Sequence, residues 1–233
     1  MNSISINAEM TKAILDGRKT QTLRVIKPDF IMHKDSEYKY SIRDKRMRWN
    51  DFKTIEDFIK FSSKYKKGDI IWVREPVKII YATIDKSVDY NIWTFKYKAD
   101  NKKKTGKIPE RLKKEDFPDW IYENKYVPNG CTVEMARIFL NIINIRVERL
   151  QDISVEDIIK EGITVNTQSL EKYCKSDEES YYLEFKELWN KTAPKGYKWD
   201  DNPFVFIYEF KKIVEDKKDK QKTKVKTVEE LIK

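Results

Sequence analysis

The residues best suited to chemistry in this chain are a lysine and a threonine three positions apart. Residues 17–24 read Gly-Arg-Lys-Thr-Gln-Thr-Leu-Arg, with three cations and two hydroxyls directly after an expected helix end. On a strand, Thr22 and Arg24 share one face, and Lys19 can curl over that face from the preceding turn. Neighbouring cations and burial in a cleft both lower the pKa of a lysine. A fall from about 10.4 to about 7–8 would let Lys19 act as a base. The alternative is a solvated basic turn, in which the threonines are ordinary strand-forming residues.

A second candidate is Glu161, at the C-terminal end of a helix expected to begin at Ser154 and to end at Gly162. The sequence from Ser154 follows the S-x-x-[DE] capping pattern. A carboxylate at a helix C-terminus opposes the helix dipole, which suggests a functional role or an ion pair. The alternative is a solvent-facing glutamate on an exposed helix end.

Trp72 and Arg74 alternate along an expected strand and therefore share a face. An indole beside a guanidinium could clamp a base or a phosphate. Packing of Trp72 into a core is the alternative. We therefore take Arg18, Arg24, Trp72 and Arg74 as candidate substrate-binding residues.

Short helices and scattered strands are expected to position these side chains. Apolar periodicity and capping residues predict helices in the second half of 6–17 and near 55–61, 154–161 and 178–191. Alternating or continuous apolar runs predict strands at 20–26, 70–75, 92–98, 203–210 and within 132–150. Segments 29–67 and 100–128 read as insertions, irregular apart from the helix near 55–61. This order favours an α+β fold, a small mixed β-barrel decorated with helices, in one domain over 1–213.

The composition limits the class of protein. The chain has 233 residues, of which 39% are hydrophobic and 13% aromatic, which excludes a wholly disordered chain despite 37% charged residues. No apolar run reaches the roughly 20 residues of a membrane span, and the first residues lack the pattern of a secretory signal. We therefore expect a cytoplasmic protein without a membrane partner. Residues 214–233 read as a basic, solvated tail.

Metal and cofactor sites are not expected from the sequence. The single histidine, His33, argues against zinc sites built on several histidines and against a Ser-His-Asp triad, for which only one position could supply the base. Cys131 and Cys174 form no Cys-x-x-Cys pair and read as inert thiols. The net charge of +9 favours a polyanionic partner only weakly, because 38 of the 48 basic residues are lysines spread along the chain.

Five segments together resemble the ASCH domain family, and most closely the long ASCH-like proteins of bacteriophages and prophages. They are residues 13–24, 68–75, 146–153, 161–163 and 204–211, in the family's order along the chain. The G-R-K-T-x-T-x-R pattern followed by a Gly-Asp-hydrophobic strand is the specific part. The resemblance implies a PUA-like fold, a small mixed β-barrel with helices. It also implies a nucleoside, RNA or DNA partner.

Some small ASCH proteins are amidohydrolases that remove the acetyl group from N4-acetylcytidine. By that resemblance Thr22 is the nucleophile, Lys19 its base and Glu161 a proton carrier or substrate-orienting group. A hydroxyl needs an adjacent base to attack an amide, and Arg24 is a candidate for stabilising the oxyanion. The chain departs from the family in its length and in segment 126–135, which affects the expected substrate. A non-catalytic RNA- or DNA-binding module, or a ribonuclease, therefore stays open.

Overall fold

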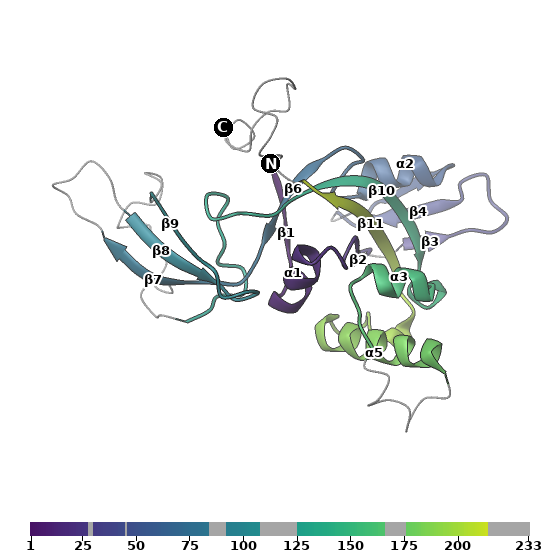
Figure 1. Ribbon diagram of the computed structural model, residues 1–233. Helices are drawn as coiled ribbons and strands as arrows, with labels where there is room; N and C mark the ends of the chain where they lie inside the picture. The colour runs from purple at the N-terminus through teal and green to yellow at the C-terminus, as the bar shows by residue number, and fades with distance from the viewer. Residues whose placement is uncertain (28–29, 45, 84–91, 108–124, 166–175, 214–233) are drawn as a thin grey trace, which may run out of the picture. The chain divides into compact units, whose positions relative to one another are not determined.

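The computed structural model describes residues 1–27, 30–44, 46–83, 92–107, 125–165 and 176–213 (Figure 1). These residues form two compact units. Unit 1 comprises Met1–Asp16, Ile70–Leu140 and the chain from Lys212, and unit 2 comprises Gly17–Asp69 and Asn141–Lys211. Cys174, the expected tail at 214–233 and much of segment 100–128 lie outside the described residues. The expectation of one domain over 1–213 stays a prediction.

Unit 1 begins with a parallel strand pair and a capped helix. Strand β1 (Asn2–Ser5) pairs with β6 (Ile70–Arg74). Helix α1 (Ala8–Leu15) starts where the Asn7 side chain accepts the backbone N–H of Met10 at 2.8 Å, which satisfies one of the free donors of the first turn. The helix lies within the segment that the sequence predicted.

The second sheet of unit 1 is antiparallel, in the order β7 (Val77–Thr83), β8 (Ile92–Tyr97), β9 (Lys103–Lys107). Its inner face buries Trp93, Phe95 and Tyr97 of β8 in the unit's hydrophobic core. Only β8 was predicted. The loop expected over 100–128 contains β9, whose sequence of three lysines, a threonine and a glycine has low strand propensity and depends on pairing with β8.

The sheet that carries the candidate residues of unit 2 runs β10 (Phe139–Arg149), β11 (Phe204–Lys212), β2 (Gln21–Val25), with β11 and β2 antiparallel. One face packs on helices α3 (Val155–Lys160) and α5 (Asp177–Thr192). The 3-10 turns η3 (Leu150–Asp152) and η4 (Trp199–Asp201) precede α3 and β11. All these strands and α-helices were predicted, because each has a strong apolar pattern.

Segment 29–67 is not the irregular insertion that the sequence suggested. Its described part forms an antiparallel sheet of β3 (Phe30–Met32), β4 (Tyr40–Arg43) and β5 (Trp49–Phe52), followed by helix α2 (Ile55–Ser62). Phe30 and Phe52 pack on Phe58 of α2, with ring centroids 4.4 and 5.8 Å apart. The strands are only three or four residues long, and β4 and β5 mix polar with apolar residues, so they were missed.

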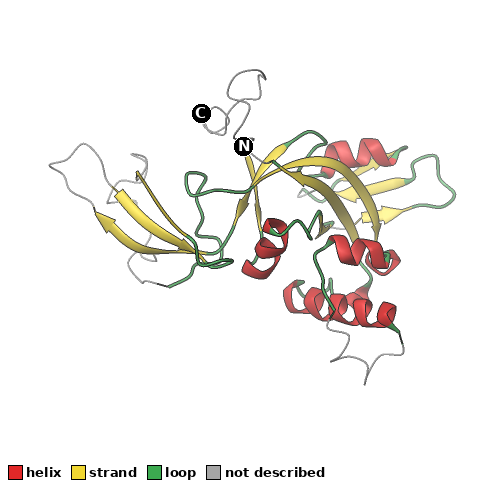
Figure 2. Cartoon of the chain, in the orientation of Figure 1, coloured by secondary structure: helices red, strands yellow, loops and turns green. Residues whose placement is uncertain are grey.

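The protein is therefore α+β, as predicted, with several sheets and few helices (Figure 2). The closed barrel that the sequence suggested is not found in the described residues, where the strands form open sheets. The sheets do not close into a barrel because the strand at each edge has only one neighbour, as β2 has in β11. No helix within the described ranges is long and apolar enough to cross a membrane.

Candidate functional site

The candidate site of unit 2 forms where the end of α3 meets the start of β2. Gly162, with φ of 90°, ends the helix and leaves the last carbonyl groups without intrahelical partners. Residues 18–20 supply the donors. Thr20 N–H donates to Lys160 O at 2.8 Å, Lys19 Nζ to Glu161 O at 2.8 Å, and Arg18 Nη1 to Gly162 O at 3.0 Å. Two cations therefore lie at the negative end of the helix dipole.

Lys19 and Glu161, 142 residues apart in the chain, form a buried ion pair. Lys19 Nζ donates to Glu161 Oε2 as well as to the Glu161 carbonyl. The other carboxylate oxygen accepts the backbone N–H of Leu23 at 2.5 Å. The two residues are only 3% and 8% exposed. Glu161 is therefore not the solvent-facing residue of a helix end, and its carboxylate is anchored to both Lys19 and β2.

Burial lowers the pKa of Lys19, because the charged ammonium loses its hydration. The attraction and hydrogen bond of Glu161 oppose this shift, and Arg24 adds a further lowering by repulsion. The net direction is downward, as the sequence predicted from clustered cations and desolvation. A lysine in this environment releases its proton at a lower pH than a solvated lysine does.

Thr22 is buried, at 2% exposure, and lies opposite Tyr208 in the β2–β11 register. Arg24, two residues along the same face, donates from Nη1 to Thr22 Oγ1 at 2.9 Å and to Leu23 O at 2.8 Å. The predicted residues thus form two contacting pairs, Lys19 with Glu161 and Thr22 with Arg24. Both pairs lie within unit 2.

Two tyrosines that the sequence did not assign to the site lie near Arg24. The rings of Tyr65 and Tyr208 meet edge to face, with centroids 5.1 Å apart, and Tyr208 Oη lies 3.1 Å from Ser63 Oγ. Burial raises the pKa of Tyr65 to about 12, and the charge of Arg24 opposes the shift. Burial also raises the pKa of Tyr208. Tyr65 carried no sequence signal, because it lies in the loop between α2 and β6 and meets Tyr208 of β11 only through the fold.

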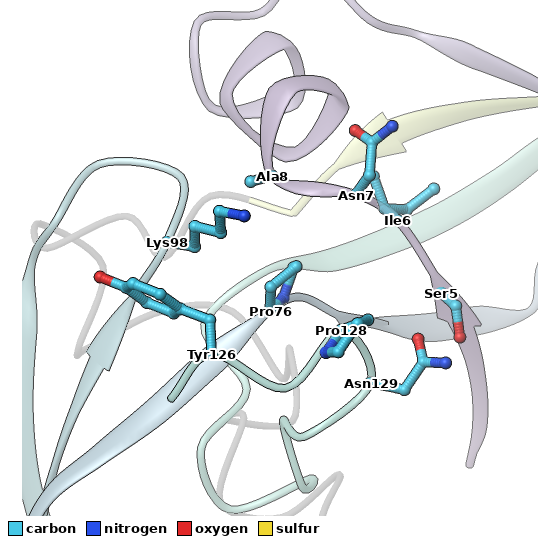
Figure 3. A pocket seen from close by; sticks show the side chains of 9 residues that line it. All are labelled: Ser5, Ile6, Asn7, Ala8, Pro76, Lys98, Tyr126, Pro128 and Asn129. Carbon is cyan, nitrogen blue, oxygen red and sulfur yellow. The ribbon is translucent and has the colours of Figure 1, made fainter. Parts of the chain in front are cut away.

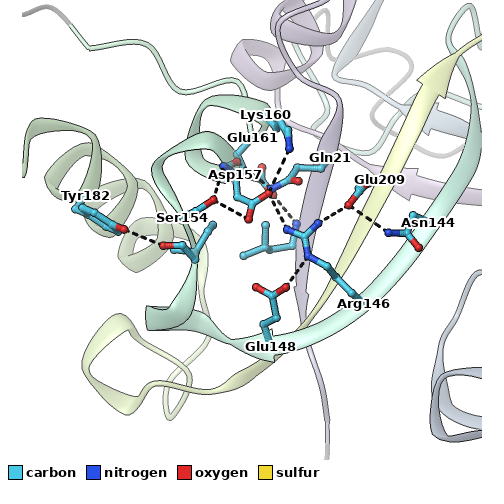
Figure 4. Close-up of polar contacts among 12 residues, drawn as sticks. Gln21, Asn144, Arg146, Glu148, Ser154, Asp157, Lys160, Glu161, Tyr182 and Glu209 are labelled. Atoms are coloured by element: carbon cyan, nitrogen blue, oxygen red, sulfur yellow. Dashed lines mark hydrogen bonds and ion pairs between the residues drawn. The ribbon is translucent and has the colours of Figure 1, made fainter. Parts of the chain in front are cut away.

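Arg146 of β10 holds α3 in place (Figure 4). Its guanidinium contacts Asp157 of α3 at 2.7 Å, Glu148 at 2.6 Å and Glu209 of β11. Asp157 N–H in turn donates to Ser154 Oγ at 3.2 Å, which is the N-terminal cap that the sequence predicted. The helix that carries Glu161 is thereby fixed at its start by a charged cluster.

Trp72 and Arg74 belong to unit 1 and are described with it. They share a face of β6, as predicted. Trp72 is partly buried and packs against the hydrophobic core of that unit. Arg74 donates to the backbone oxygen of Asn129 at 2.7 Å. Both residues therefore have structural contacts within unit 1, the alternative that the sequence left open for Trp72.

His33, to which the sequence gave no role, lies in a depression of about 380 Å³ in unit 2. Its Nε2 is 2.9 Å from Ser41 Oγ, and Ser41 Oγ donates to Asp51 Oδ1 at 2.6 Å. Because the hydroxyl proton points to Asp51, His33 is the donor in the other contact. In a Ser-His-Asp triad the acid holds the histidine and the histidine accepts from the serine. This arrangement has neither feature and does not activate Ser41.

A cysteine thiol and possible metal ligands are the other reactive groups to consider, and neither forms a site among the described residues. Cys131 is a buried free thiol whose pKa burial raises to about 12, so it is not a thiolate nucleophile near neutral pH. Among the residues that the structure describes, no group of three or more His, Cys, Asp or Glu side chains could hold a metal ion.

The chain matches no family model, no curated protein and no solved structure.

Proposed function

We propose that the protein is a PUA-like hydrolase that cleaves the amide bond of a modified base, of the N4-acylated cytidine type. The observation that carries this proposal is the buried Lys19, whose pKa is lowered and whose ammonium is held by Glu161. Lysine, threonine and glutamate are the residue types that the resemblance to the small ASCH amidohydrolases implies for this chemistry, and Lys19, Thr22 and Glu161 are all buried in one unit.

The proposed reaction begins when neutral Lys19 takes the proton of the Thr22 hydroxyl as its oxygen attacks the acyl carbon. The carbonyl oxygen becomes an oxyanion, which the guanidinium of Arg24 stabilises. The protonated Lys19 then donates to the cytosine N4 as the amide bond breaks, leaving an acyl ester on Thr22. Water hydrolyses the ester, and its proton returns through Lys19. Glu161 orients Lys19 through both steps.

The competing explanation is that the Lys19–Glu161 pair only joins α3 to β2. The same contacts would serve that purpose, because Lys19 donates to the Glu161 carbonyl at the helix end and the Glu161 carboxylate accepts the Leu23 N–H of the edge strand β2. Thr22 distinguishes the two explanations. Its hydroxyl is not needed to join the helix to the strand, whereas the hydrolysis depends on it.

The test is to compare wild type with Thr22→Val on N4-acetylcytidine, following release of acetate. Valine keeps the shape and strand propensity of threonine but has no hydroxyl. We expect hydrolysis to fall by a factor of about 10² to 10⁴ or more, the usual contribution of one catalytic group. The unfolding midpoint should change little, and Thr22→Ser should retain part of the activity.

Thr20→Val is the matched control, because Thr20 lies on the same stretch but is exposed. It should hydrolyse the substrate at the wild-type rate. If Thr22→Val is as active as Thr20→Val, Thr22 is not the nucleophile and the proposed hydrolysis is wrong. Wild-type protein inactive on acylated cytidine as a free nucleoside and within RNA would also reject it.

A further inference from the structure

The outer face of the β7–β8–β9 sheet in unit 1 carries a row of lysines. In the strand register Lys78 lies opposite Lys96, and Lys96 lies opposite Lys103, so all three side chains leave the same side of the sheet. The inner side is the one that buries Trp93 and Phe95 in the core. The row therefore crosses all three strands on the face away from that core.

This arrangement has an electrostatic cost. Like charges directly opposite each other on a sheet destabilise it, and the three strands contain no Asp or Glu to compensate. A polyanion lying across the strands would remove the repulsion by pairing each ammonium with a negative group.

Next to the row lie residues suited to contact bases. Tyr81 is opposite Thr94, and Thr94 is opposite Thr105, so a second row on the same face holds a ring and two hydroxyls. Tyr81 is 60% exposed. The register shift between Ile79 and Tyr81 turns its ring outward. An exposed ring beside cations is the combination that single-stranded nucleic acid uses, with bases stacked on aromatic residues and phosphates paired with lysines.

The lysine row also leads to a cavity. Lys78 Nζ lies 5.3 Å from the centre of the Tyr126 ring, and Lys98 Nζ lies 5.8 Å from it. Tyr126 and Lys98 line a cavity of about 290 Å³, with Pro76 and Asn129 among its other walls (Figure 3). Its size is near the lower limit of small-molecule sites, and its aromatic and cationic walls suit one nucleotide at the end of a bound strand.

We propose that the outer face of β7–β8–β9 binds single-stranded nucleic acid. Lys78, Lys96 and Lys103 contact consecutive phosphates, and Tyr81 stacks on a base. This surface belongs to unit 1 and uses neither Lys19 nor Thr22, so the binding does not depend on the hydrolysis proposed above. The exposed Tyr81 ring beside the lysines favours a nucleic acid, whose bases can stack on it, over an acidic protein or a membrane surface.

The test measures binding of fluorescent 15-nucleotide RNA and DNA single strands by anisotropy at several salt concentrations. Each lysine that pairs with a phosphate contributes about −0.7 to the slope of log K against log salt for a single strand. Replacing Lys78, Lys96 and Lys103 together by glutamine should therefore make the slope shallower by about 2. Tyr81→Ala should weaken binding by about 5- to 150-fold, the range for loss of one stacked base.

Two matched controls separate local contacts from general charge. Glutamine at the exposed Lys12, Lys60 and Lys191 removes the same charge elsewhere, and Phe61→Ala removes another exposed ring. Neither control should change the salt slope by more than a fraction of the change caused by replacing Lys78, Lys96 and Lys103. Because the lysine row costs stability, the triple variant should unfold at the same temperature as wild type or higher, which shows that the sheet is intact.

Several results would overturn the proposal. One is that no single strand binds at low salt, and another is that the two triple lysine variants give equal salt slopes. The proposal is also wrong if the protein binds anionic vesicles but not oligonucleotides, or if it prefers duplex and Tyr81→Ala does not alter that preference. Thr22→Val should bind as wild type does. If wild type hydrolyses acylated cytidine but binds no single strand, only the binding proposal fails; if it binds single strands but does not hydrolyse acylated cytidine, only the hydrolysis proposal fails.

Discussion

Each unit contains a buried carboxylate paired with a cation, but the two pairs are built differently. In unit 1 Arg137 binds both oxygens of Glu75, at 2.8 and 2.7 Å, and Asp100 at 2.8 Å. Its guanidinium also lies 3.7 Å from the centre of the Tyr97 ring. In unit 2 Lys19 has one carboxylate partner, Glu161, and one neutral carbonyl. The first cation has two negative partners and the second has only one.

The difference affects which group can change its charge. Burial opposes the charge of Arg137, but its hydrogen bonds to Glu75 and Asp100 outweigh this and raise its pKa. Arginine does not release a proton in proteins. Lys19 has a lowered pKa, because one carboxylate does not compensate for burial. The Arg137 cluster is therefore suited to holding unit 1 together, and Lys19 is suited to moving a proton.

The largest effect on stability is expected at Arg137. Arg137→Met leaves Glu75, at 1% exposure, as a buried carboxylate without its counter-charge. Removing one partner of a buried ion pair costs about 3–5 kcal/mol. Urea unfolding at neutral pH should show this loss. Arg74→Met is the control, because Arg74 has one hydrogen bond to a backbone carbonyl, and it should lose about 1 kcal/mol or less.

A smaller loss is expected at Lys19. Lys19→Met removes an ammonium that burial already disfavours, and Glu161 keeps the N–H of Leu23. The remaining cost is that of a buried carboxylate that keeps one hydrogen bond, about 3 kcal/mol or less, at the low end for breaking a buried ion pair. The same urea unfolding experiment measures it.

Lys160→Met serves as the control for Lys19→Met, since Lys160 is half exposed on the same helix and its ion pair with Asp157 is long, at 3.9 Å. Its replacement should cost at most about 1 kcal/mol. A loss at Lys19 equal to or greater than that at Arg137 would contradict the distinction between the two pairs. Lys19 would then be as structural as Arg137.

The sequence predicted one side of this comparison better than the other. Helix α3, its Ser154 cap and strands β2 and β11 follow from apolar period and capping pattern. The pairing of Lys19 with Glu161 came from the family resemblance, since no local pattern joins residues 142 positions apart. Arg137 was not considered, because its partners are Glu75, just after β6, and Asp100, in the turn after β8.

The sheets that the sequence did not predict were missed for the same reason, because they depend on contacts between remote parts of the chain. Strands β3–β5 and β9 are short, and their faces are defined only once neighbouring strands set the register. The lysine row of β7–β9 likewise exists only through pairing, because its three members lie in three separate strands. Charge counted along the chain showed many lysines, but not that three of them lie side by side.

The smallest expected effect, and the one that most directly tests whether Lys19 can act as a base, is on the pH dependence of stability. Burial holds the folded pKa of Lys19 below its ordinary value of 10.5. Between these two values the unfolded chain binds a proton that the folded chain has released, so the unfolding free energy rises with pH, by at most about 1.4 kcal/mol per pH unit. Tyr65, whose pKa is raised to about 12, acts in the opposite direction above pH 10. Subtracting the unfolding free energy of Lys19→Met from that of wild type removes the contribution of Tyr65, which both proteins share. The remaining difference in unfolding free energy should rise in favour of wild type as the pH rises towards 10.5. A flat difference would mean that folded Lys19 keeps its proton as tightly as a solvated lysine, and the base would have to be another group.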